Sequence, residues 1–170
     1  RDEITRISYH LLHAAGAPAG HAQTVADHLA DANLAGHDSH GFIRVPQYIA
    51  GIKEGTLDPK GEPEIVTESA GTARVNGNAT FGQVVATFST EMAIEKARET
   101  GVALVTMSNL GHTGRVGTYP EMAARAGMAA IICTGFWGRA IAGVAPFGGR
   151  EGKLGTNPIA MSFPFAPEGT

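Results

Sequence analysis

Residues 36–48 read Gly36-His37-Asp38-Ser39-His40-Gly41-Phe42-Ile43-Arg44-Val45-Pro46-Gln47-Tyr48. We call this run the signature stretch. It places His40, whose imidazole can carry a proton near neutral pH, close to Arg44, whose planar fork of donors fits a carboxylate. Gly36 and Gly41 permit sharp backbone turns. The stretch therefore predicts a proton carrier beside an anion-binding group.

Two backbone conformations are compatible with the signature stretch. If it is helical from about His40, then His40, Arg44 and Tyr48 lie four residues apart on one helix face. Pro46 argues against a continuous helix, because it lacks an N–H group and biases the preceding residue towards extended geometry. The second possibility is a tight loop over residues 38–44, followed by a helix that begins at Pro46. Both conformations keep the imidazole near the guanidinium.

The composition is that of a globular protein. The chain has 170 residues, of which 43% are hydrophobic and 17% charged, enough for a core. A net charge of −3 gives no electrostatic reason to expect nucleic acid or a membrane surface as a partner, and no apolar run approaches a membrane span. The single cysteine, Cys133, lies in an apolar run and is predicted to be a core residue. One cysteine fits a reducing cytoplasm, where we expect the protein.

Apolar periodicity predicts three helices in a helical unit over residues 1–58. The first spans residues 3–15, the second residues 21–35, and the third follows the signature stretch. Four histidines on the first two helices are predicted to be solvated or capping residues: His10, His13, His21 and His28.

The pattern changes after residue 58. Strands are predicted at residues 65–67, 73–75, 102–107, 128–133 and 158–163. Helices are expected over residues 81–101 and 118–127, the latter with Thr118 as its N-cap and Glu121 three residues on. Strands that alternate with helices predict an α/β layer with a partly parallel sheet.

Two later segments hold candidate site residues. His112 follows a predicted strand, and ligand sites favour the carboxyl ends of strands in open α/β sheets. It is a candidate proton carrier or cofactor contact, although a lone loop histidine is more often structural. Residues 135–155 form a glycine-rich segment without periodicity, and such long loops are usually functional or mobile. Thr156 and Asn157 can donate to a phosphate or ribose, or can be turn residues before a strand.

Several familiar motifs are absent. No Gly-x-Gly-x-x-Gly follows a strand, which excludes an ordinary Rossmann fingerprint. Gly152-Lys153 lacks the Ser or Thr that a phosphate loop requires after the lysine. The spacing of His37, His40 and His112 is common by chance, and we expect no metal site.

The motif Asp-Ser-His-Gly-x-x-Arg-x-Pro-x-Tyr, here Asp38 to Tyr48, resembles the N-terminal signature of the malate/L-lactate dehydrogenase family. Asn109, His112 and Gly114 fit an Asn-x-x-His-x-Gly motif that this family carries at the corresponding point. Without the resemblance, a structural role for the signature stretch, in which Asp38 and Ser39 merely cap a helix, would be equally acceptable.

The resemblance implies a fold and a reaction. The fold is a helical unit followed by a layered mixed-sheet α/β domain of the sulfolactate dehydrogenase-like type, not a Rossmann fold. Residues 59–170 would be the N-terminal part of the cofactor-binding domain, in a chain truncated relative to the family. The reaction is reversible hydride transfer between NAD or NADP and a small 2-hydroxy acid or its 2-oxo counterpart, in a homodimer or larger assembly. The alternatives are a cyclic imino-acid or diketogulonate-type reductase and a non-catalytic carboxylate-binding fragment.

The roles of individual residues follow from that reaction. Arg44 is expected to anchor the substrate carboxylate, and His40, with His112 as second choice, to act as general acid and base. Ser39 and Tyr48 are further candidate substrate contacts. The residues expected near the dinucleotide are His112, Asn109, Gly148, Gly149, Thr156 and Asn157.

Overall fold

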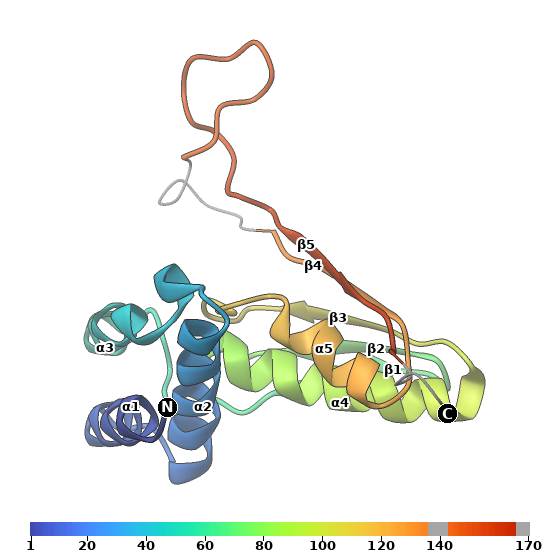
Figure 1. Cartoon of the computed structure of the whole chain (residues 1–170), viewed down its shortest axis with the longest axis horizontal. Coiled ribbons are helices and arrows are strands. Elements are labelled where there is room, and N and C mark those ends of the chain that lie inside the picture. Colours follow the sequence, from blue (N-terminus) through green and yellow to red (C-terminus); the bar gives the residue numbers. More distant parts are fainter. Residues whose placement is uncertain (136–142, 166–170) are drawn as a thin grey trace. The chain divides into compact units, whose positions relative to one another are not determined.

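The computed structural model describes residues 1–135 and 143–165. The chain forms two compact units, Arg1–Arg115 and Val116–Thr170, whose elements are labelled in Figure 1. The predicted division near residue 58 falls inside the first unit, because helix α2 (Ala19–Leu34) packs against helix α4 (Gly82–Thr100). Part of the glycine-rich segment, including Gly138, lies outside the described residues.

The three predicted N-terminal helices are confirmed. Helix α1 (Asp2–Ala14) packs on α2 and on α3 (Val45–Glu54). Between α2 and α3, the signature stretch forms two short 3₁₀ turns, η1 (Asp38–His40) and η2 (Phe42–Arg44). Of the two conformations considered, the tight loop is therefore the correct one. Pro46 lies in the first turn of α3, where its missing N–H has no intrahelical partner to lose.

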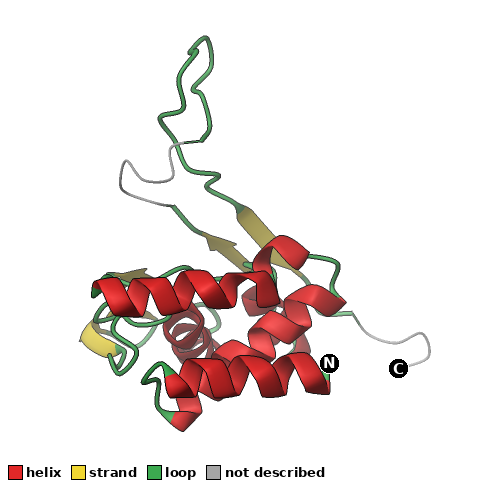
Figure 2. Ribbon diagram, turned by 90° about the vertical axis from the view of Figure 1, so that its left-hand side faces the viewer, coloured by secondary structure: helices red, strands yellow, loops and turns green. Residues whose placement is uncertain are grey.

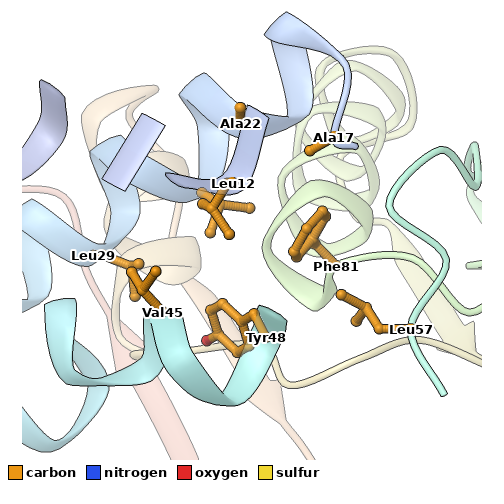
Figure 3. Packing of buried hydrophobic residues seen from close by; sticks show 9 residues of the cluster. Leu12, Ala17, Ala22, Leu29, Val45, Tyr48, Leu57 and Phe81 are labelled. Atoms are coloured by element: carbon orange, nitrogen blue, oxygen red, sulfur yellow. The ribbon is translucent and has the colours of Figure 1, made fainter. Parts of the chain in front are cut away.

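The hydrophobic core of the first unit brings α1, α2, α3 and the start of α4 together. Figure 3 shows Leu12, Leu29, Val45 and Phe81 packed around the ring of Tyr48. The Tyr48 and Phe81 rings meet edge to face, with centroids 6.1 Å apart. Tyr48 is only 3% exposed, so the core fixes the position of its hydroxyl group.

The prediction that the helix histidines are solvated or capping residues is wrong for two of the four. His21 is 8% exposed and His28 is 5% exposed, whereas His10 and His13 are exposed. The ring of His21 bonds to the carbonyl of Pro59 over 3.1 Å. A histidine can be buried in this way because its nitrogens have fixed partners inside the protein.

The sheet of the first unit is mixed, as predicted. Strand β1 (Glu64–Glu68) pairs antiparallel with β2 (Thr72–Asn76), and β2 pairs parallel with β3 (Leu104–Ser108). Helix α4 connects β2 to β3 and packs against both strands. The chain that leaves the carboxyl end of β3 carries His112.

The second unit contains α5 (Thr118–Arg125) and the antiparallel pair β4 (Ala130–Cys133) and β5 (Ile159–Ser162). Figure 2 shows the long loop that precedes β5. Within it, Val144 and Leu154 form an isolated bridge. No helix in the described parts of the chain is long and apolar enough to cross a membrane.

Two predictions for the second unit are wrong. Thr118 is the first residue of α5, and Gly117, which has no side chain, is the N-cap. Cys133 is exposed rather than buried, because β4 belongs to a two-stranded sheet that leaves alternate residues uncovered. Apolar residues on these strands share this exposure, as in Ile131 and Ile159.

Candidate active site

Asn33, near the end of α2, holds the signature stretch in its folded form. Its Oδ1 accepts a hydrogen bond from the Phe42 N–H over 2.9 Å, and its Nδ2 donates to Asp38 Oδ1 over 2.5 Å. A Cβ at Gly41 would collide with the Asn33 side chain. The turn between η1 and η2 therefore requires glycine at this position.

Arg44 is tied to the same loop by two bonds. Its Nε donates to the carbonyl of Ser39 over 2.5 Å, and one of its terminal nitrogens donates to Gln47 Oε1 over 2.8 Å. A guanidinium has five N–H donors, so these bonds orient the group without exhausting its capacity to bind a carboxylate. The Ser39 hydroxyl and His40 Nδ1 lie 2.9 Å apart, which orients the His40 ring as well.

His112 joins this cluster from the loop after β3. The Tyr48 hydroxyl lies 3.0 Å from His112 Nδ1, and the ring of His40 stacks on that of His112 with centroids 5.3 Å apart and 28° between the planes. Gln83, on the first turn of α4, donates from Nε2 to the Tyr48 hydroxyl over 2.7 Å. Residues from α3, α4 and two loops thus meet at one polar cluster.

Burial and neighbouring charges shift the pKa values of the residues in this cluster. Burial, followed by the charges of Arg44 and His40, lowers the pKa of His112 to about 4. Burial, followed by Arg44 and His37, also lowers the pKa of His40. Burial raises the pKa of Tyr48 to about 12, against the opposing effects of Gln83 and Arg44. At neutral pH the site therefore contains a neutral imidazole of His112 and a protonated phenol.

His28 supports the loop that carries His112. Its Nε2 accepts the backbone N–H of Arg115 over 2.8 Å. Burial, with smaller effects of His112, Arg115 and His40, lowers the pKa of His28 to about 4, which keeps this acceptor neutral. Gly114 has a φ of +71°, and a Cβ there would collide with the His28 ring. The loop therefore fits α2 only with glycine at residue 114.

The remaining candidate residues are exposed. Asn109 has a φ of +54°, and its Nδ2 donates to Asn76 Oδ1 over 3.0 Å, so its side chain links two strand ends. In the second unit, the candidates for dinucleotide contact are Gly148, Gly149, Thr156 and Asn157. The described ranges, 1–135 and 143–165, contain no group of three or more metal-ligating side chains.

Comparison with known proteins identifies the family. The family model described as malate/L-lactate dehydrogenase matches residues 1–170. The chain belongs to this family. Malate/(S)-sulfolactate dehydrogenase of Methanothermus fervidus is 44% identical over 154 residues, which cover 91% of this chain and 44% of that protein. Hydroxycarboxylate dehydrogenase B of Escherichia coli K12 is 41% identical over 143 residues, which cover 84% of this chain and 39% of that protein.

Solved structures of the malate/L-lactate dehydrogenase family share the fold. Malate dehydrogenase from Entamoeba histolytica matches with a TM-score of 0.91 and 37% identity over 98% of this chain and 45% of that one. Delta1-piperideine-2-carboxylate reductase from Pseudomonas syringae matches with a TM-score of 0.86 and 28% identity, over 96% of this chain and 48% of that one. The chain thus spans less than half the length of these relatives, and the expected family and α/β class are confirmed.

Proposed function

We propose that this chain supplies the substrate-binding and acid/base part of an oxidoreductase that interconverts small 2-hydroxy acids and 2-oxo acids with NAD or NADP. The observation that carries the proposal is the 3.0 Å contact between Tyr48 and His112 Nδ1, with the ring of His40 stacked on His112 beside Arg44. A carboxylate anchor and an oriented imidazole are the groups that this reaction requires.

Each residue has a distinct task in this proposal. Arg44 binds the carboxylate of the acid, and Ser39, whose carbonyl accepts from Arg44 Nε, holds the guanidinium in place. His112 exchanges the proton of the substrate hydroxyl group through Nε2, because its other ring nitrogen, Nδ1, already contacts the Tyr48 hydroxyl. Sequence reasoning placed His40 first. We now favour His112 because it is the more buried of the two and is oriented through a buried phenol.

A bound nicotinamide would accept or supply the hydride. The hydroxyl of Thr156, the amide of Asn157 and the backbone at Gly148 and Gly149 are exposed groups of the kind that bind phosphate and ribose. In the second unit, these residues are the proposed contacts for the phosphate and ribose groups of a dinucleotide. In the first unit, His112 and Asn109 are separate candidates for cofactor contact. The choice between NAD and NADP, the cytoplasmic location and the homodimer stay predictions.

A second candidate reaction is reduction of a cyclic imino acid. The structural match to a piperideine-carboxylate reductase favours it, because such a substrate also carries a carboxylate next to the bond that is reduced. Arg44 would bind that carboxylate in the same way. The two candidates differ in the atom that receives the proton, an oxygen in one case and a nitrogen in the other.

A substrate panel with the full-length protein tests the proposal. Small 2-oxo acids and cyclic imino acids are each offered with NADH and with NADPH, and cofactor oxidation is followed. The Arg44→Lys variant is expected to raise KM for the acid roughly ten- to a hundredfold, because a point charge replaces a bidentate fork. Arg6→Lys, at an exposed position of α1, is the matched control. An unchanged KM in Arg44→Lys would remove Arg44 as the anchor, and inactivity on the whole panel would refute the proposed reaction.

A further inference from the structure

Gln83 is a buried amide at the end of the hydrogen-bond chain that reaches His112. The residue has no exposed surface, and its Nε2 donates to the Tyr48 hydroxyl, which in turn lies 3.0 Å from His112 Nδ1. In the described part of the chain, Gln83 Oε1 is buried without a hydrogen-bond partner. A buried amide oxygen without a partner is costly, so its presence beside the acid/base cluster calls for a physical reason.

The direction in which the hydrogen bonds from Gln83 through Tyr48 to His112 are donated decides which nitrogen of His112 carries the proton. A phenol has one hydrogen. While Gln83 Nε2 donates to the phenol oxygen, the phenol hydrogen is donated to His112 Nδ1, and the neutral imidazole carries its own proton on Nε2. In that state Nε2 has no lone pair for the hydroxyl proton of a 2-hydroxy acid.

Proton abstraction by Nε2 requires the opposite direction. His112 must then carry its proton on Nδ1 and donate it to the phenol oxygen, and Tyr48 must donate its hydrogen to an acceptor at residue 83. Gln83 Oε1 can be that acceptor, because a half-turn of the amide exchanges Oε1 and Nε2 with almost no change in shape. Oε1 has no bond to lose in the turn, so the two orientations differ little in hydrogen bonding.

We propose that Gln83 is a positioning residue that sets the protonated nitrogen of His112, by presenting either Nε2 or Oε1 to the hydroxyl of Tyr48. The inference rests on the proposed function, in which Nε2 of His112 exchanges the substrate proton. Gln83 itself touches neither substrate nor cofactor in this role. It acts only through the phenol.

Two substitutions at residue 83 fix the direction of these hydrogen bonds in opposite ways. In Gln83→Glu, burial raises the pKa of the new carboxyl, so the spectra are recorded as the pH is raised until this group is ionised. The carboxylate then only accepts, so Tyr48 donates to it and His112 carries its proton on Nδ1. In Gln83→Met, residue 83 neither donates nor accepts, so Tyr48 donates to His112, which carries its proton on Nε2. Nitrogen NMR of isotope-labelled histidine in the full-length protein distinguishes the two tautomers, and His112→Gln identifies the signals of His112.

The expected result is a change of the His112 tautomer to Nδ1–H in Gln83→Glu and retention of Nε2–H in Gln83→Met. In Gln83→Met, kcat for the 2-hydroxy acid should fall roughly ten- to a hundredfold with KM little changed, as for other groups that orient a reacting residue. Ser89→Ala is the control, since Ser89 is also buried on α4 with an unpartnered hydroxyl. It should leave the His112 signals in place.

An identical His112 tautomer in the wild type and in folded Gln83→Glu overturns the inference. If Gln83→Met does not fold, the Tyr48→Phe variant provides a second test. Adding Gln83→Glu to Tyr48→Phe should no longer move the His112 signals, because the phenol that links the two residues is absent. The His112 tautomer is measured without turnover. The proposed role of Gln83 and the proposed reaction can therefore be refuted independently. A tautomer that responds in a protein inactive on every acid refutes the proposed reaction alone.

Discussion

The two segments rich in glycine and polar residues differ sharply in how they are held. In the first unit, the loop that carries His112 has no space for a Cβ at Gly111 or Gly114. In the second unit, a Cβ at Gly143 or Gly148 would have no neighbour within 4 Å. Packing therefore constrains the first loop at both glycines, whereas among the described residues of the second segment it leaves Gly143 and Gly148 open and is tight at Gly149, whose Cβ would lie 3.0 Å from Pro146. The difference shows that packing within residues 1–115 holds the loop that carries His112, whereas the segment with the proposed dinucleotide contacts is packed less tightly at Gly143 and Gly148.

The largest effect should come from the imidazole in the packed loop. His112→Ala is expected to lower kcat by roughly 10²- to 10⁴-fold, the usual contribution of a general acid/base. His40→Ala should lower kcat less, because His40 is the less buried ring of the stacked pair. Steady-state kinetics of both variants, with His10→Ala at an exposed position of α1 as control, measures the ranking. A larger loss in His40→Ala would reverse the two assignments.

The next effect concerns the packing of that loop. Gly114→Ala is expected to destabilise the protein by roughly 2–4 kcal/mol, since the new methyl group adds a collision with His28 to the strain of a left-handed backbone. Gly36→Ala, at a φ of +74° with no atom within 4 Å, should cost only about 1 kcal/mol of backbone strain. Denaturant unfolding compares the two variants. Equal losses of unfolding free energy in the two variants would show that the collision with His28 adds nothing to the cost of the substitution.

A pH dependence of stability follows from the buried His28. The pKa of His28 is lowered in the folded protein to about 4 from its ordinary 6.5, so the unfolded chain binds more protons between these values. The free energy of unfolding should therefore fall as the pH is lowered through this window, by about 2–3 kcal/mol for this ring. The groups that face His28 are His112, Arg115 and His40. His28→Gln should make the dependence less steep without abolishing it, because the pKa of His112 is also lowered to about 4, and His10→Gln should leave it unchanged.

The smallest effect is expected in the second unit. Thr156→Ala should weaken dinucleotide binding by about 1 kcal/mol, roughly fivefold in Kd, which is the ordinary value of one neutral hydrogen bond. Cofactor fluorescence measures the change in Kd, and Thr67→Ala, an exposed threonine on β1, is the control. Binding that is identical in Thr156→Ala and the wild type would remove Thr156 from the proposed dinucleotide contacts.

The sequence was most informative where a physical pattern repeats. Apolar periodicity located the helices and the strands, whereas Pro46 left a helix from His40 and a loop before α3 both open, and the structure shows the loop. The motifs gave His40, Arg44 and His112, which the structure brings together in one cluster. Their grouping could not be derived from spacing alone, because Tyr48 on α3 and His112 on the loop after β3 are far apart in the chain and meet only when the first unit folds.

Three supporting residues were not predicted: Asn33, His28 and Gln83. Each is a single polar residue on a helix, and apolar periodicity assigns no role to such a residue. Their partners are backbone groups or hydroxyls of distant segments, so the sequence alone carries no local signal for them. The exposure of Cys133 was missed for a related reason, since an apolar run does not reveal whether a second layer covers it.

Tyr48 belongs to two structures at once. Its ring is part of the hydrophobic core, and its hydroxyl contacts His112 Nδ1, so the packing of the interior fixes one hydrogen-bond partner of the proposed acid/base residue. Leu29 and Val45 are buried in the same core cluster as Tyr48, so we expect substitutions there to shift the phenol. A search for variants with altered activity therefore has reason to include the buried positions that fix this phenol.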